Sequence, residues 1–147
     1  MSITTISLTE LLVGAKDGVF RFRPDNVDEV TAPGFNRILV PTRKLRDKPG
    51  FLAACAAALA FPAHFGHNWD AFYDCVAGLD ERLGPAALLI FDDLSGFART
   101  EPEEFDAAID ALSDACEFWR GHGARLIVLA GLGEPLLAPQ LTAVSLR

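Results

Sequence analysis

The sequence predicts a single α/β domain in which helices pack on a small parallel sheet. Three short segments, RILVP, AALLIF and RLIVLA, are apolar apart from the arginine that begins two of them, which is typical of strands buried on both faces of a parallel sheet. Stretches of helical length separate them, and this alternation favours parallel strands joined by right-handed crossovers. With 147 residues, half of them apolar, the chain can bury a core without disulfides or a structural metal.

Residues 1–35 are expected to add an edge element to this sheet. SLTELLVGA is compatible with a short helix, and GVFRFR alternates like a half-buried strand. PDNVDEVTAPG has the composition of a loop. We therefore treat this segment as an N-terminal extension that contains a short helix and an edge strand.

The next part of the chain predicts a strand and two helices. RILVP forms the strand, and Asp47 is a suitable N-cap for a helix over KPGFLAACAAALA. Pro49 is tolerated in the first turn of that helix, and Pro62 ends it. A second helix is expected over residues 68–80.

The last part predicts two more strands around one long helix. AALLIF and RLIVLA are the strands, and DDLSGFARTEP is expected to be a loop. Thr100 and Glu103 have the spacing of a capping box, and Gly121 and Gly123 end the helix that follows. Apolar side chains that recur every three or four residues should face the sheet: Phe105, Ile109, Leu112, Cys116 and Trp119. Residues 131–147 are expected to form a tail, either a loop or a packed extension.

Charge and cysteine usage narrow the class of partner and the compartment. Thirteen basic and twenty acidic residues give a net charge of -7, which disfavours nucleic acid or an anionic membrane as the main partner and suits a basic one. Cys55, Cys75 and Cys116 form no CxxC pair and lie in helical patterns, which indicates buried free thiols in a reducing compartment. No signal peptide and no membrane-length apolar stretch is apparent, so we expect a cytoplasmic protein.

Functional side chains are concentrated in FPAHFGHNWDAFYDC, residues 61–75. Gly66 supplies a flexible turn, and Asn68 is a suitable N-cap for a helix that begins at Trp69. A helical wheel separates the side chains that follow into two groups. The apolar side holds Phe72, Cys75, Val76 and Leu79, and the polar side holds Asp70, Asp74, Ala77 and Glu81 if the helix stays regular.

The polar side of this helix is predicted to bind a cation. Asp70 and Asp74 are one turn apart and repel each other, and no Lys or Arg on that face relieves the repulsion. The small Ala77 and Gly78 leave the two carboxylates prominent, and Tyr73 offers aromatic contact area beside them. A merely solvated helix face is the alternative interpretation.

FPAHFGHNWDAFYDCVAGL resembles the corresponding segment of the barstar family, intracellular inhibitors of secreted bacterial ribonucleases. In that family an aromatic-rich loop with Gly and Asn opens a helix that bears two aspartates four residues apart and then Cys. The order of strands and helices is also similar over roughly residues 36–130. The resemblance implies a three-stranded parallel sheet with helices packed on it, and it divides the chain into an extension at 1–35, a barstar-like domain at 36–130 and a tail at 131–147.

The resemblance also implies a function, that of a protein inhibitor with no cofactor, no metal and no catalytic residue. Its partner would be a basic ribonuclease, whose active site the helix and the preceding loop would block, and no direct contact with nucleic acid, a membrane or a small-molecule substrate is expected. Asp74 would take the place of a phosphate. The partner-binding residues carried over are His64, Gly66, Asn68, Trp69, Asp70, Tyr73, Asp74, Ala77, Gly78 and Leu79.

Some of these positions depart from the family pattern. The family inhibitor has tyrosine in place of His64, tryptophan in place of Tyr73 and another aromatic in place of Leu79, so a different cognate surface is expected. A further acidic contact on the last long helix falls at Phe118, with Glu117 one residue away.

Two other hypotheses remain open. A barstar-like binding module can have a basic partner that is not a nuclease. Alternatively, His64, His67, Asp70 and Asp74 are metal-ligand types at close spacing, as in a small metal-dependent hydrolase. The turn within the segment interrupts the helical register that would align these side chains, and no CxxC or HExxH pattern accompanies them. An inhibitor of a basic ribonuclease is therefore the main prediction.

Overall fold

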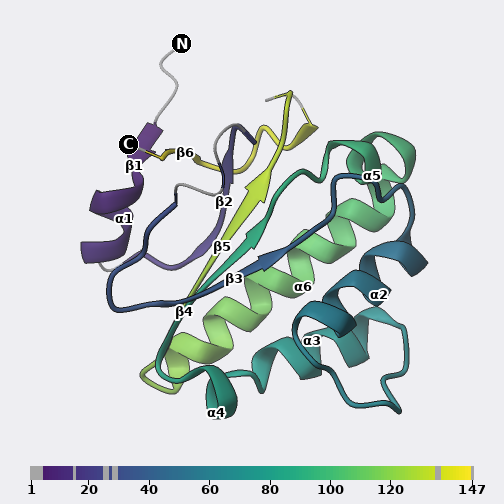
Figure 1. Cartoon of the computed structure of the whole chain (residues 1–147), viewed down its shortest axis with the longest axis horizontal. Coiled ribbons are helices and arrows are strands. Elements are labelled where there is room, and N and C mark those ends of the chain that lie inside the picture. Colours follow the sequence, from purple (N-terminus) through teal and green to yellow (C-terminus); the bar gives the residue numbers. More distant parts are fainter. Residues whose placement is uncertain (1–4, 15, 25–26, 28–29, 135–136, 147) are drawn as a thin grey trace.

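A six-stranded sheet forms the centre of the computed structural model of the chain (Figure 1). The strand order is β1-β6-β2-β5-β4-β3, and every recorded strand pair is parallel. The structure describes residues 5–14, 16–24, 27, 30–134 and 137–146. The strands are β1 (Thr5–Ser7), β2 (Gly18–Phe22), β3 (Asn36–Val40), β4 (Ala86–Phe91), β5 (Arg125–Gly131) and β6 (Ala143–Ser145).

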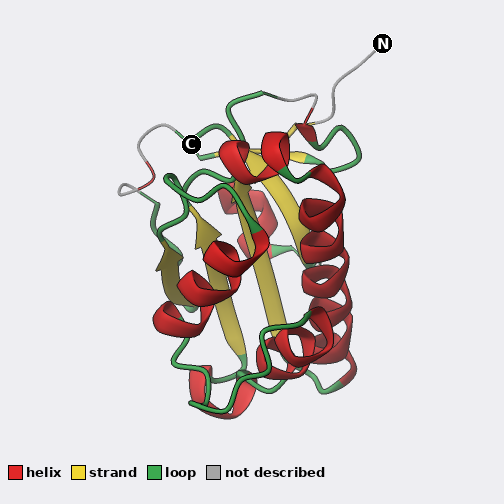
Figure 2. Ribbon diagram, turned by 90° about the vertical axis from the view of Figure 1, so that its right-hand side faces the viewer, coloured by secondary structure: helices red, strands yellow, loops and turns green. Residues whose placement is uncertain are grey.

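Helices cover both faces of this sheet. They are α1 (Leu8–Val13), α2 (Lys48–Ala58), α3 (Trp69–Ala77), α4 (Asp80–Leu83), α5 (Ser95–Thr100) and α6 (Pro102–Gly121). Side chains of α2, α3, α5 and α6 share one buried cluster with the sheet, and side chains of α1 belong to a second cluster. The longest helix, α6, runs alongside the strands (Figure 2). None of the helices in the described residues is both long and apolar enough to cross a membrane.

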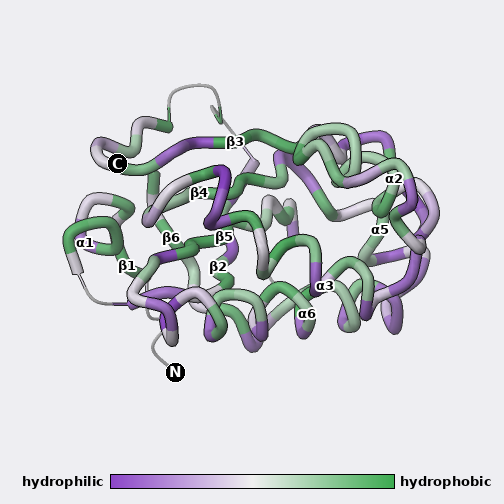
Figure 3. The backbone as a smooth tube through the Cα atoms, turned by 90° about the horizontal axis from the view of Figure 1, so that it is seen from below, coloured by the Kyte–Doolittle hydropathy of each residue, from purple (hydrophilic) through white to green (hydrophobic). Residues whose placement is uncertain are grey.

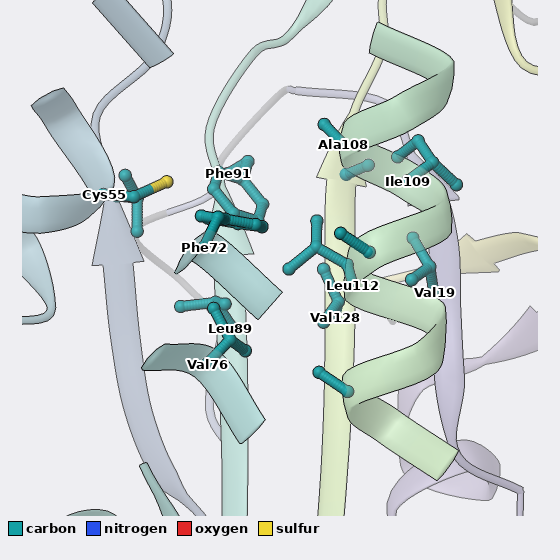
Figure 4. Packing of buried hydrophobic residues seen from close by; sticks show 14 of the residues in the cluster. Val19, Cys55, Phe72, Val76, Leu89, Phe91, Ala108, Ile109, Leu112 and Val128 are labelled. Carbon is teal, nitrogen blue, oxygen red and sulfur yellow. The ribbon is translucent and has the colours of Figure 1, made fainter. Parts of the chain in front are cut away.

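The predicted parallel arrangement of the three apolar strands is confirmed. β4 pairs with β3 on one side and with β5 on the other, in parallel register along both. The predicted apolar stripe of α6 is buried, and α6 packs against β5 and β2. Figure 4 shows Ile109 and Leu112 of α6 among the strand residues Val19 and Val128. The hydropathy of the chain accordingly places green segments in the sheet and purple ones along the outside of α6 (Figure 3).

The expected sheet of three strands is wrong, because the sheet has six. Both ends of the chain contribute the additional strands. β2 is not an edge strand, since it lies between β5 and β6 and pairs with β5 from Gly18 to Phe22. β5 is buried almost throughout, and a buried strand needs hydrogen-bond partners on both sides for its backbone N–H and C=O groups. β2 supplies that second set of partners.

Three local expectations also need correction. The predicted loop after β4 contains α5, so Thr100 lies in a helix and its hydroxyl donates to the carbonyl of Gly96 instead of opening a capping box. The helix expected at 68–80 ends at Ala77, and α4 follows as a separate turn. Parts of the predicted N-terminal loop and of the tail, residues 25–26, 28–29, 135–136 and 147, lie outside the described residues.

Arg125 joins the N-terminal residues to the rest of the sheet. Its Nε donates to Oδ1 of Asp17 at 2.7 Å, and Arg120 of α6 lies 3.5 Å from the other oxygen of that carboxylate. The Arg125 guanidinium also donates to the backbone carbonyls of Leu11, Leu12 and Lys16. The Arg125 side chain therefore provides hydrogen-bond donors for carbonyl groups at the C-terminal end of α1. It also places a positive charge beside the buried carboxylate of Asp17.

Candidate protein-binding site

A groove of about 660 Å³ runs between α3 and α6. The two helices lie side by side, and the indole nitrogen of Trp119 in α6 donates to the carbonyl of Val76 in α3 at 3.1 Å. From α3 the groove is lined by Trp69, Asp70 and Tyr73, and from α6 by Ala107, Asp110, Ala111, Asp114, Glu117 and Phe118. Carboxylates and aromatic rings thus surround an alanine surface, and none of the described residues that line the groove is Lys or Arg.

The loop before α3 is shaped by its own side chains. Asn68 is the N-cap, and its side-chain oxygen accepts from the backbone N–H of Ala71 at 2.8 Å. Its amide nitrogen donates back to the carbonyl of Gly66 at 3.1 Å. His67 has φ 48°, in the left-handed region, which lets the chain reverse before the helix begins. The predicted cap is therefore present, whereas the left-handed residue before the helix is His67 and not the predicted Gly66.

Asp70 and Asp74 are exposed on the outer side of α3, one turn apart. Neither carboxylate has a recorded hydrogen bond or ion pair with the described residues. Asp70 lies in the first turn, where the helix dipole favours a negative charge, whereas Asp74 has no such compensation. Two adjacent negative charges are thus presented to solvent.

The structure separates the ten predicted contact residues into three groups. His64, Gly66, Asn68, Asp70, Asp74 and Gly78 are exposed, and Trp69 and Tyr73 are half-buried. Ala77 and Leu79 are buried, with 5% and 4% of their surface exposed. The helical wheel placed Ala77 on the polar side, and its burial corrects that placement. α3 ends at this residue, and the chain turns at Gly78 so that Leu79 enters the core.

Trp69 makes polar contacts with two other helices. Its Nε1 donates to Oε2 of Glu104, in the first turn of α6, at 2.9 Å. The ammonium of Lys48, the first residue of α2, lies 5.3 Å from the centroid of the indole and 3.7 Å from the same Glu104 oxygen. The aromatic side chain predicted to contact a partner is therefore also part of the packing between α2, α3 and α6.

The α6 wall contains two acidic residues that sequence reasoning did not select. Asp110 and Asp114 line the groove together with Glu117, which had been considered for an acidic contact. Phe118 is 40% exposed, and its ring lies 4.3 Å from the ring of His122. Spacings of four and three residues place the three acids on one helix face, but only the packing of α6 beside α3 brings them near Asp70.

The three cysteines have no disulfide partner. Burial raises the pKa of the Cys55 thiol strongly and raises that of Cys116 to about 12, with Asp17 adding to the effect at Cys116. Cys75 is half-buried beside Asp74, and its pKa is raised by desolvation and then by that carboxylate. All three thiols are therefore protonated, and weak nucleophiles, at neutral pH.

The residues of the metal hypothesis are all exposed, His64 and His67 in the loop and Asp70 and Asp74 on α3. In the part of the chain that the structure describes, no group of three or more His, Cys, Asp or Glu side chains is arranged to hold a metal ion.

Comparison with known proteins connects this site to a family. Residues 36–131 match the sequence profile of Barstar, described as barstar (barnase inhibitor). The match runs from β3 to the end of β5, so it includes α3, the loop before it and α6. A comparison with curated proteins gives no match. Because the profile covers well over half of the chain, the protein belongs to the Barstar family.

Proposed function

We propose that this chain is a protein inhibitor that binds a basic ribonuclease and closes its active site with α3 and the preceding loop. One observation carries the proposal most directly. Asp70 and Asp74 are exposed and unpaired by the described residues, and Asp70 lines an acidic and aromatic groove. The Barstar family contains inhibitors of this kind, and the family match includes the site. The proposed role is binding, without a catalytic step.

Electrostatics supply the specificity of such a complex. A ribonuclease active site carries cationic groups that hold the phosphate of RNA, and the carboxylate of Asp74 can replace that phosphate. No described residue forms an ion pair with the carboxylates of Asp70 and Asp74, so no such pair within that part of the chain has to break on binding. Complementary charge of this type increases the association rate and disfavours acidic partners.

The α6 wall extends the proposed contact surface. Asp110, Asp114 and Glu117 place negative charge on the opposite side of the groove from Asp70. Phe118 offers an exposed ring at the position where the family resemblance led us to expect an acid. Because Leu79 and Ala77 are buried, we assign the side-chain contacts to the exposed and half-buried residues of the predicted set. An intracellular, cytoplasmic location goes with this proposal.

An affinity capture with matched baits tests the proposal. The wild-type chain, Asp74→Ala and Glu10→Ala serve as baits for lysate and secreted protein of the source cell, and captured proteins are identified by mass spectrometry. Glu10 is an exposed acid of α1, so its replacement removes the same charge far from α3. Each captured protein, and barnase as a reference, is then assayed for RNA cleavage with and without the chain.

The expected result is a basic ribonuclease that both wild type and Glu10→Ala capture and inhibit, and that Asp74→Ala does not. If the protein that Asp74→Ala fails to capture is basic but has no nuclease activity, the partner belongs instead to the alternative class, a basic protein that is not a nuclease. If Asp74→Ala retains every captured protein and full inhibition, the proposed site is wrong.

A further inference from the structure

The first turns of three helices meet around Trp69. Lys48 begins α2, Trp69 begins α3, and Glu104 lies in the first turn of α6. Glu104 accepts the indole N–H at 2.9 Å and lies 3.7 Å from the Lys48 ammonium, and that ammonium is 5.3 Å from the ring centroid. In addition, the backbone N–H of Lys48 donates to the side chain of Glu101 at 2.7 Å. We call Lys48, Trp69 and Glu104 the indole clamp.

The indole of Trp69 has two separate roles in this arrangement. Its nitrogen is already bonded to Glu104, and Lys48 lies over its ring. The same side chain nevertheless lines the groove between α3 and α6. A hydrogen bond to a charged acceptor and a cation–π contact both restrict the orientation of the ring. The groove wall is therefore oriented before anything binds.

We propose that Lys48 and Glu104 are positioning residues that fix the Trp69 indole as a rigid wall of the groove, so that a partner meets the ring surface and not the indole N–H. The binding of a partner at this groove rests on the proposed function, whereas the contacts of the indole clamp are a property of the free chain. A side chain ordered in advance lowers the entropy cost of association. The clamp thus affects binding through Trp69 without direct contact between Glu104 and the partner.

Nuclear magnetic resonance of the free protein tests the clamp directly. The chain has two tryptophans, so a ¹H–¹⁵N spectrum contains two indole signals, which Trp69→Phe assigns. Trp119 is fully buried and bonded to Val76, and its indole proton serves as an internal reference. The variants are Glu104→Ala, Glu104→Gln, Lys48→Met and, as control, Glu103→Gln, an exposed acid in the same turn of α6.

We expect Glu104→Ala to accelerate hydrogen exchange of the Trp69 indole roughly 10- to 100-fold, the factor that corresponds to a hydrogen bond to a charged acceptor. Glu104→Gln keeps an oxygen acceptor and should restore much of the exchange protection of the Trp69 indole. Because both variants lack the negative charge of Glu104, this difference between them reports the hydrogen bond and not the charge. Lys48→Met should give a smaller acceleration, about 2- to 5-fold. Glu103→Gln should have no effect, and the Trp119 signal should not change in any variant. Equal exchange of Trp69 in Glu104→Ala and wild type would overturn the inference.

A binding measurement then separates this inference from the proposed function. Against a ribonuclease whose capture depends on Asp74, we expect about tenfold weaker binding for Glu104→Ala, recovery with Glu104→Gln and no change for Glu103→Gln. Faster exchange in Glu104→Ala with unchanged affinity would refute the positioning role while the proposed site stands. If Asp74→Ala binds normally, the proposed site fails, and the exchange rates still decide whether the clamp orders Trp69.

Discussion

Replacing Asp17 with asparagine should destabilise the protein far more than removing a salt bridge of similar length at the surface. Only 4% of the Asp17 side chain is exposed, and the carboxylate lies 2.7 Å from Nε of Arg125 and 3.5 Å from Nε of Arg120. Removing one member of a buried ion pair leaves the other charge without compensation and costs about 3 to 5 kcal/mol. Arg125 keeps its three backbone carbonyl partners and is 26% exposed, so we expect about 3 kcal/mol.

Glu134→Gln is the matched control for this variant. Glu134 lies 2.6 Å from Arg99, but the two side chains are 58% and 52% exposed, so the pair contributes about 0 to 1 kcal/mol. Both substitutions remove one negative charge and retain the shape of the side chain. Burial is the principal difference between them.

Urea titration followed by circular dichroism gives the free energy of unfolding of both variants. A single transition with about 3 kcal/mol lost in Asp17→Asn would place the N-terminal residues in the same cooperative unit as the rest of the sheet. If Asp17→Asn loses no more stability than Glu134→Gln, the burial argument is refuted. A separate early transition in the wild type would show that the N-terminal residues unfold independently.

Four further predictions concern the binding site, the backbone and the thiols. Asp74→Ala should weaken binding by about 2 kcal/mol or more and change the free energy of unfolding by only a few tenths of a kcal/mol, because its carboxylate is exposed and none of the described residues pairs with it. Titration calorimetry and thermal melts would contradict this if stability fell and affinity did not. The association rate with a basic partner should fall steeply as salt rises from about 0.05 to 0.5 M, and stopped-flow rates that do not change would argue against electrostatic steering. Ala60 has φ 53°, a left-handed conformation that glycine adopts more readily than alanine, so Ala60→Gly should raise the free energy of unfolding by about 0.5 to 1 kcal/mol. Ala57→Gly within the helix α2 should instead lower it by about 1 kcal/mol. Urea titration of both variants checks this pair of opposite signs. At pH 8 iodoacetamide should alkylate Cys75 first and leave Cys116 unreacted until the protein unfolds, because Cys116 is buried with a pKa of about 12. Equal alkylation rates of the two thiols, measured by mass spectrometry, would contradict this prediction.

The motif segment was predictable because its signals are local. Asn68 caps α3 through a bond three residues along the chain, and the acids at Asp70 and Asp74 are neighbours on any regular helix. The end of α3 was less predictable. Ala77 belongs to the polar side on an isolated helical wheel, but the turn at Gly78 and the entry of Leu79 into the core bury it. A wheel includes neither the helix end nor the neighbouring helices.

By itself the sequence determined the α/β class, the three parallel strands β3, β4 and β5, the buried stripe of α6 and the acidic residues of α3. Each of these depends on a periodicity or a spacing within one segment. Only the tertiary structure decided that β2 pairs with β5, that Asp17 meets Arg125, and that Asp110 and Asp114 lie across a groove from Asp70. Asp17 and Arg125 are 108 residues apart, and a contact of that separation depends on how complete helices and strands pack to satisfy their buried polar groups and apolar surfaces. No local pattern encodes that packing.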